Sequence, residues 1–277
     1  MSETLRVALL VRGTDIPEWQ ARTVERMLAR TDAEVTHVVR NAADGGDGGF
    51  GHYLERVREY PLWAPIGAAF RLRGPPAYRT PRDLDAVGGL GDPEMLAVEP
   101  EPAPDFGNVL PDRAVDRVAE ADVAVRFGFG ILKGDVLDAP EHGVLSFHHG
   151  DLREYRGQPA GFWEFVDGES TAGVTLQRLS ETLDGGEIVA YEPVDIADAR
   201  TWNEVRRRLF DASDGLLANG IENVAKGVEP RDPDQLGDLY SLPKGRAVLK
   251  YLAVEGTGRL RQVAGSLPRR RDGSAEL

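Results

Sequence analysis

The run Leu5-Arg6-Val7-Ala8-Leu9-Leu10-Val11 opens the regular part of the chain and is apolar at every position except Arg6. Such a run is typical of a strand buried on both faces of a parallel sheet. Residues 16–30 follow with helical spacing, with Asp15 as the expected N-cap and Pro17 near the first turn. Residues 34–39 are again strand-like. A strand, a helix and a strand within about 35 residues predict a βαβ unit.

The alternation of helix and strand is less regular over residues 41–112 and then resumes. The stretch begins with the glycine cluster Asp44–Gly49, which lacks the Lys and Ser/Thr of a phosphate-binding loop and is expected to be flexible. A helix near 52–60 and a strand at 95–98 are expected after it. Further along, the pattern predicts helices at 112–120, 134–139, 159–166, 202–225 and 242–252 and strands at 121–127, 144–148, 173–179 and 187–194, with Thr201 as an N-cap. We therefore expect a Rossmann-like, mostly parallel α/β sheet with helices on both faces over residues 1–227, and a short, partly flexible C-terminal extension over 228–277.

The composition excludes several classes of protein. The chain has 277 residues, of which 41 % are hydrophobic, and no cysteine. Disulfide scaffolds, thiolate metal sites and cysteine nucleophiles are therefore excluded. No apolar run approaches the roughly 18 residues of a membrane span. The N-terminus has no secretory pattern, so we expect a cytoplasmic protein without a membrane partner.

The charge balance is strongly acidic. Asp and Glu number 46 against 33 Lys and Arg, a formal net charge of −13, and only four of the basic residues are lysines. Such a surface repels polyanions, which argues against extended nucleic-acid binding. It also favours a salt-adapted, halophilic protein, because salt screens the self-repulsion. A GC-rich genome is the alternative, but it explains only the excess of arginine.

Two adjacent histidines, His148 and His149, close the strand that begins at Val144. Parallel α/β sheets place functional groups at the carboxyl ends of their strands, and here Gly150 and Asp151 follow directly. Strand alternation puts Ser146 and His148 on one side and His149 on the other. The alternative to a functional role is a histidine that only caps a loop at the end of the strand.

Two further segments are candidates for binding or catalysis. The turn Leu183-Asp184-Gly185-Gly186-Glu187-Ile188 contains a carboxylate beside two glycines, although an ordinary Asp-Gly hairpin has the same pattern. The loop Phe127-Gly128-Phe129-Gly130-Ile131-Leu132 ends the preceding strand and suits a flat heterocycle, although a core-packing loop would look alike. Neither segment is specific by itself.

Taken together, residues 126–188 resemble the formyltransferases that use 10-formyltetrahydrofolate. Residues 127–132 are similar to the folate loop of that family. Residues 146–157 are similar to its Asn-x-His strand end and the following Tyr/Trp-Arg-Gly, residues 172–175 to its Thr-Gly-Val-Thr strand and residues 183–188 to its Leu-Asp-x-Gly-x-Ile turn. One position departs from the pattern, because Ser146 stands where the family has its catalytic Asn.

The resemblance implies formyl transfer from 10-formyltetrahydrofolate, as co-substrate, to an amine. It implies folate contacts from residues 127–132 and Leu183, and no metal. His148 with Ser146 would stabilise the oxyanion, and Asp184 would take up the amine proton. The serine either does the work of the amide or marks a protein that binds folate and catalyses poorly.

The acceptor follows only by elimination. The loop of residues 12–17 lacks the Gly-Ser-Asn pattern expected for glycinamide ribonucleotide, and methionyl-tRNA would require a larger C-terminal RNA-binding domain and a less acidic chain. An amino-sugar nucleotide is therefore the expected small-molecule partner. The alternatives are the methionyl-tRNA and glycinamide ribonucleotide enzymes, a formate-releasing hydrolase and a catalytically weak folate-binding homologue. A homodimer is a further expectation.

Overall fold

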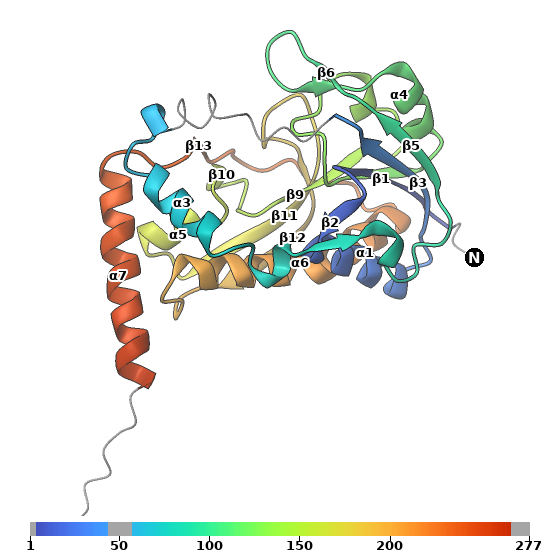
Figure 1. Ribbon diagram of the computed structural model, residues 1–277. Coiled ribbons are helices and arrows are strands. Elements are labelled where there is room, and N and C mark those ends of the chain that lie inside the picture. Colours follow the sequence, from blue (N-terminus) through green and yellow to red (C-terminus); the bar gives the residue numbers. More distant parts are fainter. Residues whose placement is uncertain (1–3, 44–56, 267–277) are drawn as a thin grey trace, which may run out of the picture.

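The computed structural model describes residues 4–43 and 57–266 and is built on a seven-stranded sheet with the order β12-β11-β9-β8-β1-β3-β5 (Figure 1). Its strands are β1 (Arg6–Val11), β3 (Glu34–Asn41), β5 (Glu94–Val98), β8 (Val123–Arg126), β9 (Val144–His148), β11 (Thr171–Arg178) and β12 (Glu187–Asp195). The five strands from β9 to β5 are parallel, whereas β11 is antiparallel to β9 and to β12. The predicted mostly parallel α/β sheet is confirmed.

The remaining elements surround this sheet. The helices are α1 (Glu18–Arg30), α3 (Ala64–Leu72), α4 (Asp112–Ala119), α5 (Phe162–Asp167), α6 (Trp202–Ala225) and α7 (Arg246–Ser266). Single 3-10 turns are η1 (Ala77–Arg79), η2 (Leu84–Ala86) and η3 (Asp135–Leu137). Three short strand pairs join β2 (Asp15–Pro17) to β4 (Pro81–Asp83), β6 (Glu101–Pro102) to β7 (Asn108–Val109), and β10 (Tyr155–Gly157) to β13 (Asp238–Tyr240).

The opening apolar run has no polar face because both of its faces are covered. Val7, Leu9 and Val11 of β1 belong to the core shared with α1 and α6. Ala8 and Leu10 point the other way, into the core shared with α4. Figure 1 shows α1 and α6 on one side of the sheet and α4 on the other, as predicted.

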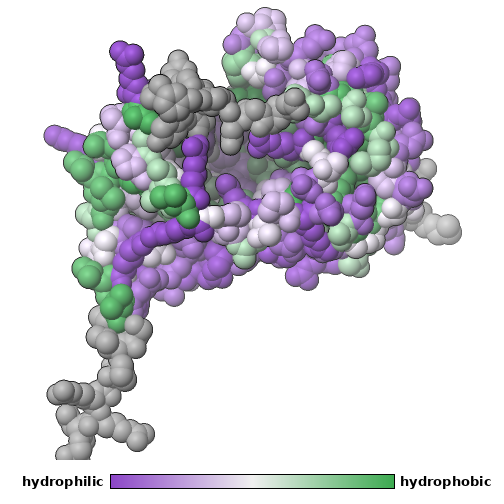
Figure 2. All heavy atoms as spheres, viewed as in Figure 1, coloured by the Kyte–Doolittle hydropathy of each residue, from purple (hydrophilic) through white to green (hydrophobic). Residues whose placement is uncertain are grey.

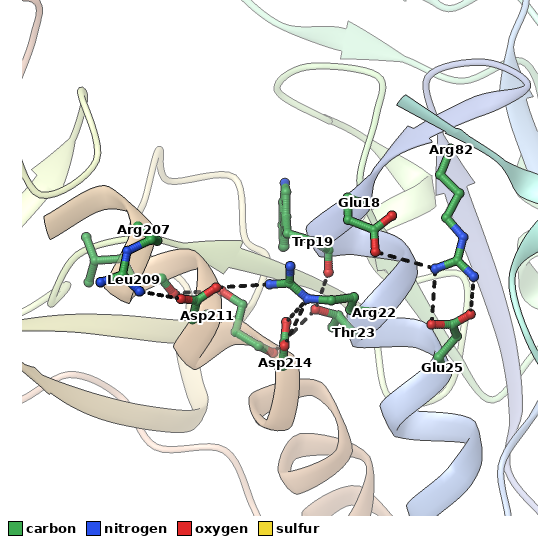
Figure 3. A network of polar contacts seen from close by, with 11 residues as sticks. Glu18, Trp19, Arg22, Thr23, Glu25, Arg82, Arg207, Leu209, Asp211 and Asp214 are labelled. Atoms are coloured by element: carbon green, nitrogen blue, oxygen red, sulfur yellow. Dashed lines mark hydrogen bonds and ion pairs between the residues drawn. The ribbon is translucent and has the colours of Figure 1, made fainter. Parts of the chain in front are cut away.

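Helices α1 and α6 are joined by a polar network at their solvent edge (Figure 3). Arg22 of α1 donates from Nε to both carboxylate oxygens of Asp214, at 3.1 and 3.0 Å, and from Nη2 to Asp211. On the other side of α1, Arg82 donates to Glu25 at 2.6 Å. The Arg22 contacts therefore tie α1 to α6, and the Arg82 contact ties α1 to β4.

Three sequence-based element boundaries were wrong. Asp15 is not the N-cap of α1, because residues 15–17 are extended by pairing with β4, and the helix begins after Pro17. The helix predicted at 134–139 is only η3, because Gly134 at φ +75° bends its entry. The last helix begins at Arg246 rather than 242 and continues to Ser266, so that its end projects from the body in Figure 1.

The predicted C-terminal extension packs onto the main body. Val248 and Tyr251 of α7 are buried in the same core as Phe162 of α5. Leu249, Leu252 and other apolar side chains of α7 are exposed, and Figure 2 shows hydrophobic residues gathered at the edge formed by α3 and α7. Within the described residues, no helix combines the length and the apolar character of a membrane span.

Three predicted features fall wholly or partly outside the described residues. They are the glycine cluster 44–49, most of the helix expected near 52–60, and the Arg-rich segment at 269–271.

Candidate active site

The candidate residues meet at the carboxyl ends of β8 and β9. Strand β8 ends at Arg126 and β9 ends at His148, and the register places Arg126 beside Ser146. The turn between β11 and β12 brings Asp184 to the same place, where its carboxylate faces the His148 ring. The fold therefore brings Asp184 to Ser146 and His148, which lie close together on β9 but far from Asp184 in the sequence.

His148 is buried and its two ring nitrogens have different partners. Nε2 lies 2.9 Å from the carbonyl oxygen of Tyr155, and because a carbonyl only accepts, this nitrogen carries the proton. Nδ1 lies 3.7 Å from Asp184 Oδ1. A β-carbon on Gly150 would stand 2.7 Å from both His148 Nε2 and Tyr155 O, so only glycine leaves room for this hydrogen bond.

Asp184 is held by the backbone of its own turn and of β10. It adopts φ +43°, the left-handed region that a non-glycine residue rarely enters. Its Oδ2 accepts a 3.1 Å hydrogen bond from the Gly157 amide, and Arg156 donates to the Leu183 carbonyl. The segment is thus a hairpin connection, and this connection also aims a carboxylate at a histidine.

Ser146 does not contact His148 but is bound by Arg126. The serine is 1 % exposed. Arg126 Nε and Nη2 lie 3.1 and 2.7 Å from its Oγ. Sequence reasoning missed Arg126, although the signal was an arginine at the end of an otherwise apolar strand, and the register pairs it directly with Ser146.

His149 lies on the opposite side of the sheet, as strand alternation predicted. It packs edge-on against Trp19, and its ring centroid lies 4.0 Å from that of Phe210. Nε2 lies 3.0 Å from Ser213 Oγ. Burial, together with the neighbouring His148, lowers the pKa of His149 to about 3, so this ring is neutral and part of the core.

The predicted folate loop divides into a buried and an exposed part. Phe129 and Leu132 are 2 % and 3 % exposed and pack in the core beneath α4, whereas Gly130 is exposed and Ile131 is 38 % exposed. Gly128 is pressed against β1, where a β-carbon would stand 2.5 Å from the carbonyl carbon of Val11. Phe127 and Leu183 are half-buried. Any ligand at this loop would meet its backbone, Ile131 and those half-buried side chains.

The part of the chain that the structure describes contains no group of three or more His, Asp or Glu residues arranged for a metal ion.

Comparison with known proteins matches residues 108–221 to the family model described as formyl transferase. This segment is related to the formyltransferases. It contains every candidate site residue. A methionyl-tRNA formyltransferase of Fusobacterium nucleatum is 31 % identical over 112 residues, which are 40 % of this chain and 36 % of the relative. One of Halalkalibacterium halodurans is 35 % identical over 109 residues, 39 % of this chain and 34 % of the relative. The match therefore spans about a third of the length of these curated relatives.

Solved structures resemble the fold over a longer stretch. A glycinamide ribonucleotide transformylase from Symbiobacterium toebii aligns with a TM-score of 0.52 at 18 % identity, covering 86 % of this chain and 95 % of its own. An N-formyltransferase from Helicobacter canadensis aligns with a TM-score of 0.55 at 10 % identity, covering 91 % and 81 %. At these identities the likeness concerns the fold alone.

Proposed function

We propose that this protein transfers a formyl group from 10-formyltetrahydrofolate to the amine of a small acceptor. The observation that carries the proposal is the His148–Asp184 pair, with 3.7 Å between Nδ1 and Oδ1, beside the buried hydroxyl of Ser146 at the edge of the loop 127–132. The pair can hold a proton, the hydroxyl can donate to an oxygen and the loop can take a ring. These are the three tasks of formyl transfer.

The chemistry assigns one task to each side chain. The acceptor nitrogen attacks the formyl carbon, and the electron pair of the C=O bond moves to the oxygen. Ser146 donates to this oxyanion, and His148 gains positive charge beside it when the pair that it forms with Asp184 takes up a proton. The proton lost by the amine enters the Asp184–His148 pair and passes to the folate nitrogen as the carbon–nitrogen bond breaks and the C=O bond re-forms.

The residues around the loop 127–132 fit the folate co-substrate. Phe127, Ile131 and Leu183 provide apolar side chains that are only partly covered, and Gly130 leaves the loop backbone accessible. Such partly covered apolar groups beside a few fixed polar groups are usual for a heterocycle site. The N-formyltransferase from Helicobacter canadensis, which shares the fold, was solved with folinic acid and dTDP-3-aminofucose.

For the acceptor we propose an amino-sugar nucleotide, whose phosphates are anionic. Arg12 directly follows β1, and Arg40 pairs in register with Val11 near the carboxyl end of β3. Neither guanidinium forms an ion pair with a carboxylate of the described residues, and Arg40 Nε is buried without a hydrogen-bond partner there. In a chain of net charge −13, two such arginines beside the site favour a phosphorylated ligand.

Methionyl-tRNA is the second candidate, because the curated relatives over residues of the site are methionyl-tRNA formyltransferases. The acidic surface argues against it, since RNA binding usually draws on a basic patch. The two acceptors differ in size and charge, so direct competition between them is informative.

The test is a formyl-transfer assay with 10-formyltetrahydrofolate and a panel of amines, including dTDP-amino sugars, glycinamide ribonucleotide and initiator methionyl-tRNA. We expect turnover with an amino-sugar nucleotide, and a loss of about 10²–10³-fold in kcat/KM for His148→Ala. His142→Ala is the matched control, because His142 precedes the amino end of β9 and should leave the rate unchanged. Wild-type turnover in His148→Ala would overturn the mechanism. Transfer to methionyl-tRNA alone would overturn the proposal that the acceptor is an amino-sugar nucleotide.

A further inference from the structure

Arg126 makes three donor contacts at the centre of the site. It is the last residue of β8, and its side chain reaches across to β9. Nε and Nη2 both donate to Ser146 Oγ, and Nη1 donates to the carbonyl oxygen of Gly130. One side chain therefore ties the proposed oxyanion donor to the proposed folate loop.

The two donations to Ser146 decide how its hydroxyl can be used. A serine oxygen has two lone pairs and one hydrogen, and the hydrogen normally rotates freely. Here two N–H groups point at the lone pairs, at 3.1 and 2.7 Å. The hydroxyl hydrogen must therefore point away from Arg126. No hydrogen bond joins it to an acceptor among the described residues, and the side-chain oxygen of Gln177, opposite Ser146 in the sheet, accepts from the Gly186 amide.

The charge of Arg126 is also directed at the site. Burial lowers its pKa, but an arginine remains protonated far above neutral pH. Among the described residues no carboxylate lies within ion-pair distance of it, and Asp184 is the group whose charge acts on it. Elsewhere in this chain half-buried arginines such as Arg22 and Arg82 are paired with carboxylates. A half-buried cation without a carboxylate partner among the described residues is available to stabilise a developing negative charge.

We propose that Arg126 is a positioning residue for the reaction, which holds Ser146 as a hydrogen-bond donor to the oxyanion. This inference rests on the proposed formyl transfer. The amide that Ser146 replaces has donors fixed by its planar geometry, whereas a serine needs a partner to fix its hydrogen. The Arg126–Ser146 pair supplies both the direction and a positive charge, so the site is adapted to serine rather than degraded.

The experiment is a double-mutant cycle with Arg126→Met, Ser146→Ala and the double variant, measured with the best acceptor of the panel. Each single variant should lower kcat by about 10²–10³-fold with KM for 10-formyltetrahydrofolate changed little. The loss in the double variant should be much smaller than the product of the two single losses, since Arg126 acts mainly through Ser146. Arg126→Lys keeps the positive charge but not the two parallel N–H donors to Ser146, and its kcat should be roughly tenfold higher than that of Arg126→Met.

Two controls separate a positioning role from a structural one. Folinic acid should bind Arg126→Met and wild type with similar affinity by calorimetry. Arg22→Met removes a half-buried arginine that is paired with Asp214 away from the site, and should leave kcat unchanged. Loss of folinic acid binding in Arg126→Met would assign Arg126 to the loop instead and overturn the inference.

Failure of the inference and failure of the proposed function are distinguishable. If wild type is active, His148→Ala is slow and Arg126→Met retains the wild-type kcat, the inference fails and the function stands. Strictly additive losses in the cycle also overturn the inference. If wild type transfers no formyl group to any acceptor, both fail together.

Discussion

Glu164 of α5 is a buried carboxyl outside the proposed chemistry. It is 3 % exposed, and its Oε1 has no hydrogen-bond partner among the described residues. Burial, reinforced by the charges of Asp151 and Asp167, raises its pKa to about 7. In the folded protein Glu164 therefore keeps its proton up to about pH 7, whereas in the unfolded chain it loses the proton near pH 4.5.

This carboxyl predicts a pH-dependent stability. As pH rises from 4.5 to 7, Glu164 ionises in the unfolded state before it ionises in the folded state. This ionisation lowers the free energy of the unfolded state, so the stability that Glu164 contributes at low pH is lost. Glu164→Gln removes the ionisation. We expect it to be close to wild type at pH 4.5 and more stable at pH 8, by at most about 3 kcal/mol. Urea unfolding at both pH values measures this.

The control for Glu164 is Glu154→Gln, which changes an exposed glutamate that precedes β10. It should shift the free energy of unfolding little at either pH. If Glu164→Gln changed stability by the same amount at pH 4.5 and pH 8, the ionisation of Glu164 would not be the cause.

The individual site residues differ in how well sequence could predict them. His148 and Asp184 follow from backbone patterns, because a strand end and a glycine turn are local features of the sequence. The role of Arg126 is not local, since it depends on which strand lies beside β8 and on how far a guanidinium reaches. Phe129 shows the same limit, because nothing in the loop distinguishes a ring that faces a ligand from one that is 2 % exposed in the core.

At the scale of elements, the long buried strands were predictable and the short ones were not. Strands β1, β3 and β9 are buried runs whose composition alone favours extended structure. Strands β2 and β10 have three residues each and exist only because β4 and β13 come from distant parts of the chain to pair with them. Pairing of this kind has no local signal, which is why Asp15 was mistaken for a helix cap.

Helix α6 offers an element whose start was predicted and can be tested. Thr201 Oγ1 accepts from the Glu204 amide at 3.3 Å, and the Glu204 carboxylate accepts in return from the Thr201 amide. This reciprocal capping box satisfies two amides that the helix itself leaves unpaired. Thr201→Ala should therefore lower the free energy of unfolding by about 1 kcal/mol in urea.

Thr201→Ser keeps the accepting oxygen and is the matched control, with an expected loss of only a few tenths of a kcal/mol. Because the cap lies at the end of α6 away from His148, the specific activity of the folded protein should stay unchanged in both variants. Equal stability of the Ala and Ser variants would mean that the cap contributes little and that packing of Trp202 sets the start of the helix.

At the scale of the whole molecule, the basic side chains and the carboxylates form many ion pairs on the surface. Most of them are at least partly exposed, as in Arg207–Asp211 and Lys226–Glu222. Each such pair contributes between 0 and about 1 kcal/mol and is weakened by salt. After pairing, the excess of acidic residues remains, because the formal net charge is −13. Salt therefore acts in two opposite directions on this protein.

We expect the relief of self-repulsion to win, so that the protein is more stable at molar salt than at 0.1 M salt. Pairs in contact are individually weak, whereas the net charge repels over the whole surface at low ionic strength, where the Debye length is about 10 Å. Thermal unfolding in a KCl series from about 0.1 to 3 M should show a rising midpoint. A rising midpoint would place the protein among salt-adapted proteins, which the scarcity of lysine also favours.

The charge explanation can be separated from a general salting-out effect by neutralising acids that have no ion-pair partner among the described residues. Asp92, Asp138 and Glu192 are exposed carboxylates of this kind. The triple variant with Asn, Asn and Gln at these positions should unfold at a higher temperature than wild type at 0.1 M KCl, and its midpoint should rise less steeply with salt. If salt acted only through the burial of apolar surface, both slopes would be equal. A midpoint that stays flat or falls with salt in wild type would instead show that the surface ion pairs outweigh the excess of negative charge.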